Sequence, residues 1–430
     1  MEDLSLLNYD KKTLKINKPI RLIELFGGIG SQAKALERIG ADFEHYRVCE
    51  FDKYAIASYN AIHGTDFAVS DITQITADDL GIVDTDKYCY MMTYSFPCQD
   101  LSLAGKQKGM AKGENTRSGL LWEVERLLNG CSELPQVLLM ENVTQVHGKK
   151  NVEHFNEWIK FLESKGYSNY WKDLNSKNFG IPQNRNRTFM VSVLGNYTYE
   201  FPEEFPLELR LKDMLEETVD EKFYVSNALL KQIKMPVDVS GTRYGRVSYD
   251  RGFEDTGDVA SALCARDFKG MGKYKAINAI CENTEIAKSV ISAINGDIAK
   301  TIRAGGRGSV DRHSWDLVAE PKSAFEPNTC LIQPKDRDYK KKNQPREVHI
   351  ESKNDGVSHA LRTKGETMVA EPQTQLRIRK LTPKETWRLM GFDDEDFEKA
   401  AQHNSNSQLY KQAGNSIVVD VLAHIFTQML

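Results

Sequence analysis

The sequence predicts an α/β protein with a doubly wound, mostly parallel sheet and a smaller, irregular domain rich in β-structure. Between residues 19 and 194, apolar runs such as IRLIELF and VLLMENV alternate with stretches that have helical spacing. Strands that alternate with helices are typical of a parallel sheet with helices on both faces. From about residue 196 to residue 376 the pattern changes, because glycine, proline and charged residues separate short strand-like pieces. Such a change indicates a separate unit.

The helices of the first region are expected to cover the sheet. In HFNEWIKFLESK, for example, Phe155, Trp158, Ile159 and Leu162 share one helical face, and Gly166 marks the end of the helix.

Helical order returns after residue 376. The segment LTPKETWRLMGF has Thr382 as N-cap, Pro383 at the first helical position and Glu385 to close a capping box. The final VVDVLAHIFTQML is expected to be an apolar helix. We therefore expect residues 377–430 to return to the domain formed by residues 1–195, with residues 196–376 as an insert.

Three pieces of the insert, which begin at Ala260, Ala299 and Ser358, resemble one another. Each has a glycine-containing turn between two short apolar runs, which predicts a hairpin. Short hairpins also resemble one another by chance, and the irregular period leaves a true repeat undecided.

Composition excludes several classes of protein. With 430 residues, of which 40% are hydrophobic and 27% charged, the chain is neither disordered nor fibrous. Its formal charge of -4 gives no overall basic footprint, so any site for a polyanion must be local. No apolar run has the length of a membrane span, and the N-terminal segment is too polar for a signal peptide. We therefore expect a cytoplasmic protein.

The cysteines indicate neither a disulfide framework nor a zinc site. There are seven, an odd number, and no two of them form a CxxC pair. We expect no metal, although a single cysteine can still act as a nucleophile.

A glycine-rich turn follows the first predicted strand. Gly27, Gly28 and Gly30 lie where the backbone can approach a ligand closely. Their spacing is neither the dinucleotide fingerprint nor a Walker loop, so NAD and ATP are poorly supported. Glu50 ends the second strand, where a carboxylate can accept both hydroxyls of a ribose. Asp71 in the next loop either holds an adenine edge or only caps a helix. An adenosine-containing cofactor fits this pattern.

Cys98 is a candidate nucleophile. It lies in SFPCQD, directly after a strand that should end at the ligand-binding edge of the sheet. A lone cysteine is more often a small buried apolar residue than an activated thiol. Here, however, Glu141 and Asn142 end another strand, and Arg185 and Arg187 precede a further one. These neighbours favour the catalytic interpretation.

In this order along the chain, the motifs resemble those of the DNA (cytosine-5)-methyltransferase family. FGGIG resembles the cofactor loop, PCQ the nucleophile motif, ENV and QNRNR two substrate motifs, and residues 379–392 and 412–417 the two C-terminal motifs. Several motifs in register are far more specific than one alone. The resemblance implies a fold of the S-adenosylmethionine-dependent methyltransferase type. It also implies that residues 1–195 and 377–430 form the catalytic domain and residues 196–376 a target-recognition domain.

The resemblance implies S-adenosyl-L-methionine as cofactor and assigns its contacts to residues in the loops that follow the strands. They are Phe26, Gly28, Ile29, Gly30, Glu50, Phe51, Asp71, Ile72, Pro97, Leu120, Asn415 and Ser416. Phe51 stands where the family frequently has tryptophan, and Leu120 lies in a looser match.

The implied catalytic residues are Cys98, Glu141, Asn142, Arg185 and Arg187. Carbon-5 of cytosine is too poor a nucleophile to accept a methyl group until a thiolate, here that of Cys98, adds to carbon-6. A carboxyl group near N3, here Glu141, stabilises the charge that enters the ring. Arg187, supported by Arg185, presents a fixed fork of donors to the cytosine O2.

The substrate implied by the resemblance is double-stranded DNA, from which the target cytosine must be flipped out. Basic residues of the insert are candidates for the DNA contact because they accompany glycine in turns or form a lysine run. They are Arg266, Arg303, Arg307, Arg362, Lys340, Lys341 and Lys342.

Two alternatives remain at this stage. One is an RNA cytosine methyltransferase, although the Cys-Phe-Thr element typical of the transfer-RNA branch is absent. The other is an inactive DNA-binding relative, which would have no need of Cys98, Glu141 and Arg187 together. We expect a monomeric prokaryotic or phage modification enzyme, with or without a companion restriction endonuclease.

Overall fold

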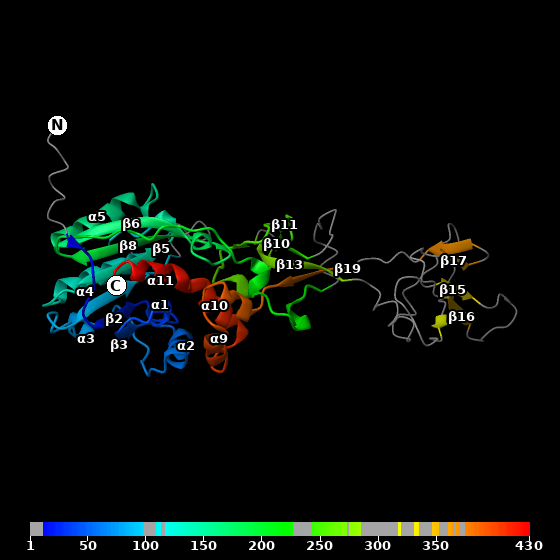
Figure 1. Ribbon diagram of the computed structural model, residues 1–430, viewed down its shortest axis with the longest axis horizontal. Coiled ribbons are helices and arrows are strands. Elements are labelled where there is room, and N and C mark those ends of the chain that lie inside the picture. The colour runs from blue at the N-terminus through cyan, green and yellow to red at the C-terminus, as the bar shows by residue number, and fades with distance from the viewer. Residues whose placement is uncertain are drawn as a thin grey trace, which may run out of the picture. The chain divides into compact units, whose positions relative to one another are not determined.

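The computed structural model describes residues 12–98, 101, 109–112, 117–226, 242–272, 275–284 and 375–430, and five short strands between 317 and 369. The chain forms two compact units (Figure 1). Unit 1 comprises Met1–Pro236, Arg243–Ile280 and Arg379–Leu430, and unit 2 comprises Val237–Thr242 and Cys281–Ile378.

Unit 1 is built on a six-stranded sheet with the order β3-β2-β4-β5-β8-β6. The strands are β2 (Ile20–Leu25), β3 (Phe43–Cys49), β4 (Cys89–Tyr94), β5 (Val137–Asn142), β6 (Tyr167–Asn175) and β8 (Asn186–Leu194). The first four run parallel, whereas β8 is antiparallel to both β5 and β6. The predicted doubly wound, mostly parallel sheet is confirmed.

The central strands β2, β4, β5 and β8 are buried on both faces, which explains why they are rich in apolar residues. The edge strands β3 and β6 are more polar and partly exposed. In β4, Met91 belongs to one hydrophobic cluster and Met92 to a second one on the other face. Helices from both ends of the chain, α1 (Ser31–Arg38) and α11 (Val419–Thr427), contribute to the first cluster. The second takes in α3 (Ala77–Leu80), α4 (Leu121–Gly130) and α5 (Val152–Ser164). As predicted, Phe155, Trp158 and Leu162 of α5 are buried.

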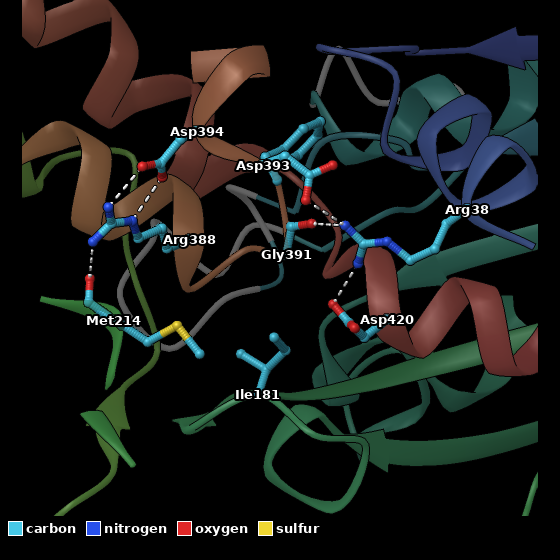
Figure 2. Close-up of a pocket in the computed structure, with 9 residues that line it drawn as sticks. Arg38, Ile181, Met214, Arg388, Gly391, Asp393, Asp394 and Asp420 are labelled. Carbon is cyan, nitrogen blue, oxygen red and sulfur yellow. Dashed lines mark hydrogen bonds and ion pairs between the residues drawn. The ribbon is translucent and has the colours of Figure 1, made fainter. Parts of the chain in front are cut away.

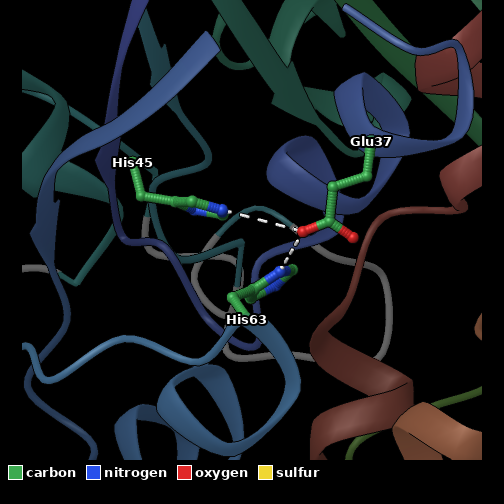
Figure 3. A group of neighbouring side chains, drawn as sticks. All are labelled: Glu37, His45 and His63. Carbon is green, nitrogen blue, oxygen red and sulfur yellow. Dashed lines mark hydrogen bonds and ion pairs between the residues drawn. The ribbon is translucent and has the colours of Figure 1, made fainter.

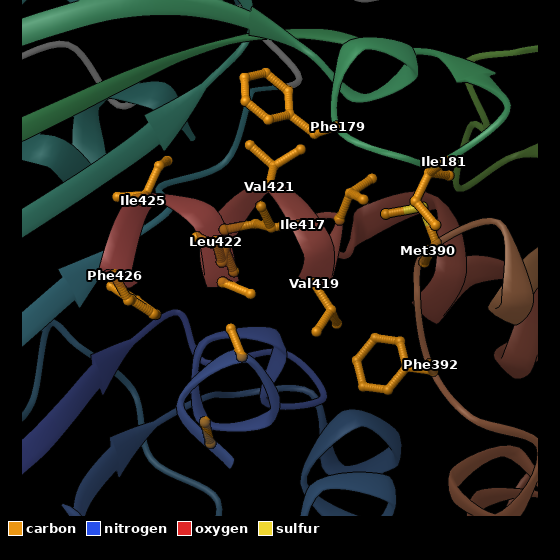
Figure 4. Close-up of a cluster of buried hydrophobic side chains, with 14 of the residues drawn as sticks. Phe179, Ile181, Met390, Phe392, Ile417, Val419, Val421, Leu422, Ile425 and Phe426 are labelled. Atoms are coloured by element: carbon orange, nitrogen blue, oxygen red, sulfur yellow. The ribbon is translucent and has the colours of Figure 1, made fainter. Parts of the chain in front are cut away.

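The C-terminal segment completes the core of unit 1. It contains α8 (Pro383–Arg388), α9 (Asp394–Ala401), α10 (Asn406–Asn415) and α11, while α2 (Lys53–His63) packs beside α9. The predicted capping box of α8 is present, because the Thr382 hydroxyl accepts from the Glu385 amide and the Glu385 carboxylate accepts from the Thr382 amide. Side chains of α11 project toward Phe179 on one side and Phe392 on the other (Figure 4).

The remaining strands of unit 1 are short. β1 (Lys12–Thr13) pairs with β9 (Tyr197–Thr198), and β7 (Gln183–Asn184) pairs in parallel with β12 (Ala260–Ser261). A four-stranded sheet has the order β11 (Gly252–Asp255), β10 (Arg243–Ser248), β13 (Ile277–Thr284) and β19 (Gln375–Lys380). β13 leads into unit 2, and β19 returns from it.

Unit 2 contains two small sheets among its described residues. One has the order β14 (Leu317–Ala319), β16 (Arg346–Glu351) and β15 (Leu331–Pro334). The other is the antiparallel pair β17 (Ala360–Thr363) and β18 (Glu366–Val369). This pair confirms the hairpin predicted from Ser358.

One expectation for the insert is corrected. The piece that begins at Ala260 is not a hairpin, because β12 pairs with β7 instead of with a following strand. The predicted target-recognition domain begins at residue 196, whereas the second compact unit begins at Val237. Residues such as Tyr199, Leu211 and Leu263 are buried in the first hydrophobic cluster, so the segments around them belong with unit 1.

Candidate active site

Four parallel strands end at one edge of the sheet and bring the predicted site residues together. The loops after β2 and β3 carry the predicted cofactor residues, and the segments after β4 and at the end of β5 carry Cys98, Glu141 and Asn142. Since β2 lies between β3 and β4, the chain switches direction across the sheet at this point. Ligands of open α/β sheets bind at such switch points.

Cys98 is held by the segment that leaves β4. The Asn142 amide group donates to the carbonyl of Phe96 over 2.9 Å, and the Ser118 hydroxyl donates to the carbonyl of Pro97 over 2.7 Å. The two residues directly before Cys98 are therefore held in place from neighbouring elements. The sequence predicts a role for Asn142 but not for Ser118, whose only signal is its place in the loose motif beside Leu120.

Glu141 and Arg187 form an ion pair beside Cys98. The Arg187 Nε lies 3.2 Å from the Glu141 Oε1, because Glu141 of β5 is paired across the ladder with a residue of β8 close to Arg187. Burial raises the pKa of the Glu141 carboxyl, and Arg187 and Arg185 oppose that shift. Burial also raises the pKa of the Cys98 thiol, the Glu141 carboxylate raises it further, and the two arginines lower it. The thiol is therefore protonated at neutral pH until this balance changes.

Arg185 has different partners from Arg187. Its guanidinium is buried and donates to three backbone carbonyls, those of Leu263 at 3.1 Å, Gly414 at 3.3 Å and Ser416 at 2.7 Å. Burial lowers its pKa to about 9, and the nearby Arg187 lowers it too. These contacts join the loop before β8 to the segment around Leu263 and to the end of α10.

Gln183 makes a second connection of this kind. Its amide group donates to the carbonyl of Leu389 over 2.7 Å, and its carbonyl oxygen accepts from the Leu263 amide over 3.2 Å. At Gly414, a Cβ atom would lie 2.2 Å from the Ala265 backbone nitrogen, so only glycine allows this approach. No signal in the sequence pointed to residues 263–265 as part of the site.

The cofactor loop after β2 is a sharp turn. Phe26, Gly28 and Gly30 have φ values of 58°, 59° and 82°. The Glu50 carboxylate accepts from the Gly28 amide over 3.0 Å and from the Asp52 amide over 2.8 Å. Burial raises the pKa of Glu50. Each oxygen of the Glu50 carboxylate accepts one backbone hydrogen bond and can accept further hydrogen bonds from a ligand.

Phe51 follows Glu50 and is 72% exposed. The exposed apolar ring of Phe51 suits stacking on a planar base, and the buried Glu50 carboxylate beside it suits the hydroxyls of a ribose. The Ile72 side chain is buried and its carbonyl accepts from Arg126, whereas the Asp71 carboxylate accepts from Thr73 in a local turn. Leu120 packs against the second hydrophobic cluster. Asn415 is exposed at the end of α10, and Ser416 is buried.

The predicted DNA contacts fall mostly outside the described part of the chain. Arg303, Arg307, Lys340, Lys341 and Lys342 are not among the described residues, and Arg362 lies in β17 without a described side chain. Arg266 is exposed and precedes a short 3-10 helix, Asp267–Lys269, near the segment that Arg185 contacts.

A hollow on unit 1 is lined by charged side chains that already pair with one another (Figure 2). Arg38 binds Asp420 at 3.0 Å, and Arg388 binds both oxygens of Asp394 at 2.7 Å. These charged side chains are paired within the chain and offer no free group to a ligand. The pair between Arg38 and Asp420 also joins α1 to the C-terminal segment. None of the predicted site residues lines it.

A sequence profile described as C-5 cytosine-specific DNA methylase matches residues 20–430. The chain belongs to this family. The type II methyltransferase M2.ScrFI of Lactococcus lactis subsp. cremoris is 30% identical over 95% of this chain and 99% of its own. The orphan methyltransferase M.SPRI of Bacillus phage SPR is 29% identical over 96% and 97% of the two chains. A structure of the methyltransferase EhMeth of Entamoeba histolytica has the same fold, with a TM-score of 0.59 at 15% identity over 96% and 98% of the two chains.

The protein is therefore a DNA methyltransferase that acts on carbon-5 of cytosine and uses S-adenosylmethionine. The loop geometry fits this cofactor, because the buried Glu50 carboxylate and the exposed Phe51 ring suit a ribose and a base. No helix in the described part of this methylase combines the length and apolar character that a membrane span requires.

Proposed function

We propose that Cys98, Glu141 and Arg187 carry out the methylation chemistry and that the insert selects the DNA sequence. The observation that carries the proposal is the Arg187–Glu141 pair, held beside a partly buried cysteine at the switch point of the sheet. These three groups supply a nucleophile, a carboxyl group of raised pKa and a fixed cation.

In the first step, the Cys98 sulfur forms a bond to carbon-6 of the flipped cytosine after the thiol has lost its proton. Electron density then moves into the ring toward N3, where the Glu141 carboxyl donates a proton or a hydrogen bond. Its raised pKa favours the protonated form that this donation needs. Arg187 stays charged throughout and donates to the O2 oxygen.

S-adenosylmethionine, when bound, would supply a methyl group from its positively charged sulfur to the activated carbon-5, and its sulfur would be left as a neutral thioether. Transfer of the carbon-5 proton to water, return of any N3 proton to Glu141 and cleavage of the bond between sulfur and carbon-6 then release Cys98 as a thiolate. Asn142 and Ser118 keep the backbone that leads into the nucleophile in place, and Arg185 acts as a positioning residue.

The test is transfer of labelled methyl groups to unmethylated genomic DNA, with the modified cytosines mapped. We expect methylation confined to one short motif, no transfer by Cys98→Ala, and full transfer by Cys131→Ala as a matched control. DNA containing 5-fluorocytosine should form a covalent adduct with wild-type protein only, because fluorine cannot leave as the proton does. Transfer to RNA alone, or an adduct with Cys98→Ala, would contradict the proposal.

Relatives include a type II enzyme and phage enzymes described as orphans. We therefore propose a role in DNA modification, in a prokaryotic or phage setting and in the cytoplasm where that DNA lies. A monomer with or without a companion endonuclease is part of this proposal. Deleting the gene and challenging the DNA with endonucleases specific for the mapped motif tests whether methylation protects it.

A further inference from the structure

Three side chains from separate elements converge beside the cofactor loop. Glu37 lies on α1, His45 on β3 and His63 at the end of α2. Figure 3 shows both imidazole rings directed at the same Glu37 carboxylate oxygen. The His63 Nδ1 lies 2.7 Å from Glu37 Oε1, and the His45 Nε2 lies 3.7 Å from it. One ligand atom from each residue lies within 4.8 Å of the others.

Hydrogen bonds occupy the other nitrogen of each ring. The His63 Nε2 lies 3.3 Å from the carbonyl oxygen of Ile29, which can only accept, so this nitrogen carries the proton. The Tyr59 hydroxyl donates to the buried Glu24 carboxylate, and its oxygen therefore accepts from the His45 Nδ1 at 3.0 Å. In neutral rings, the lone pairs of His63 Nδ1 and His45 Nε2 consequently face the Glu37 carboxylate.

Three acceptors that face one another form a set that one cation can bridge. A divalent ion would bind all three. Metal-bound histidines almost always donate their second nitrogen to a carboxylate, a backbone carbonyl or water, as His63 does to the Ile29 carbonyl. The second nitrogen of His45 is held by the Tyr59 hydroxyl.

We infer that Glu37, His45 and His63 form a binding site for a divalent transition-metal ion of the zinc class. Two imidazoles and one carboxylate are a common protein ligand set for such ions, with water in the fourth position. Tetrahedral bonds of about 2.0–2.2 Å put ligand atoms about 3.3–3.6 Å apart. The observed separations fall on either side of this value, and the Glu37 side chain, 35% exposed, is free to adjust.

The surroundings allow the ion to enter and remain. The exposed part of Glu37 gives access from solvent, whereas the His63 side chain is fully buried. Lys34 lies 3.8 Å from Glu37 but binds Asp396 at 2.8 Å and Asp393 at 3.1 Å, so its charge is already balanced. A Cβ atom at Gly30 would lie 2.2 Å from His63 Nε2, which shows that His63 packs directly against the cofactor loop. A bound ion would therefore hold His63 in place and, through His63, stabilise the cofactor loop.

The experiment is a titration of the full-length protein with Co²⁺ and then Zn²⁺, followed by visible absorption and calorimetry. We expect one equivalent of Co²⁺ with the intense visible bands of a four-coordinate ion, and displacement by Zn²⁺, which adopts the same tetrahedral geometry with these ligands. Glu37→Gln and His45→Gln should each weaken binding more than about tenfold, since loss of even an outer partner costs about 10–100-fold.

Matched controls come from residues of the same types. Glu44→Gln changes a half-exposed carboxylate on the same strand as His45, and His154→Gln changes a histidine 3.6 Å from Glu157 on α5. Both should bind as wild type does. His63→Gln should also lose binding, but because His63 is buried, Glu37→Gln and His45→Gln decide the result. Absence of uptake, equal uptake by these two variants, or near-ultraviolet bands of cysteine coordination would overturn the inference.

Discussion

Substitution of each arginine of the QNRNR motif should show that Arg185 stabilises the fold and that Arg187 serves the methyl-transfer reaction. Arg185 donates to three backbone carbonyls, at 2.7, 3.1 and 3.3 Å, in a buried site. Lysine at this position keeps a positive charge but presents a single ammonium group, which cannot reach three carbonyls in the geometry of a guanidinium. Loss of two of the three bonds, at about 1.5–3 kcal/mol for each bond to a charged group, lowers the free energy of unfolding by about 3–6 kcal/mol.

Arg187→Lys is the matched variant, two residues along the same segment. Arg187 makes one ion pair, with Glu141 at 3.2 Å, and its side chain is 18% exposed. Because lysine retains the positive charge beside the buried Glu141, we expect a smaller loss of stability than Arg185→Lys causes. The rate of methyl transfer should nevertheless fall strongly, since lysine does not present a fixed fork of donors to the base.

Urea unfolding followed by tryptophan fluorescence measures the first effect, and transfer of labelled methyl groups the second. Hydrogen exchange at the Leu263 and Arg266 amides should rise in Arg185→Lys alone, because the guanidinium no longer holds that segment. If Arg185→Lys were as stable as wild type, or if Arg187→Lys retained full activity, the division of roles would be wrong.

Three further predictions concern the nucleophile, the close approach at α10 and the C-terminal helix. Alkylation of Cys98 in DNA-free enzyme should accelerate as pH rises, because the raised pKa of the thiol keeps it protonated at lower pH. Glu141→Gln removes a negative charge that raises the pKa of this thiol, so the pH midpoint of alkylation should fall. A rise in the midpoint would refute the assignment. Gly414→Ala gains about 1 kcal/mol in helix propensity but puts a Cβ 2.2 Å from the Ala265 nitrogen, so urea unfolding should show a net loss of about 1–3 kcal/mol, and a net gain would contradict the packing. Leu422→Ala, at a fully buried position, should lower the free energy of unfolding by about 2–5 kcal/mol; a loss below 1 kcal/mol would show that α11 does not complete the core.

The main sheet could be predicted from the sequence because its strands are buried on both faces. Runs such as CYMMTY and VLLMEN admit few other structures once helices flank them. The direction of β8 could not be predicted, since alternation of side chains is the same in parallel and antiparallel strands. The hairpin expected at Ala260 failed for a similar reason: the sequence shows that a strand forms, but not that its partner is β7, far away in the chain.

The candidate site also contains residues that the sequence predicts and residues that it does not. Cys98, Glu141 and Arg187 follow or begin strands, so the topology of the sheet brings them together. The contact between Arg185 and residues 263, 414 and 416 depends on where the insert packs, and no local pattern encodes that. Along the sequence, Glu37, His45 and His63 are too far apart to match a metal-binding motif. They meet only because the fold brings α1, β3 and α2 together.

The placement of α11 has a consequence for synthesis of the protein. Leu422, Ile425 and Phe426 are fully buried against elements that the ribosome makes first, among them α1. During translation, the face of the sheet that α11 covers cannot close before residues 419–427 have been made. A nascent or truncated chain without residues 414–427 would thus present an apolar face while lacking Gly414 and Ser416, two partners of Arg185. Methylation of DNA should therefore begin only after α11 has been made and has packed.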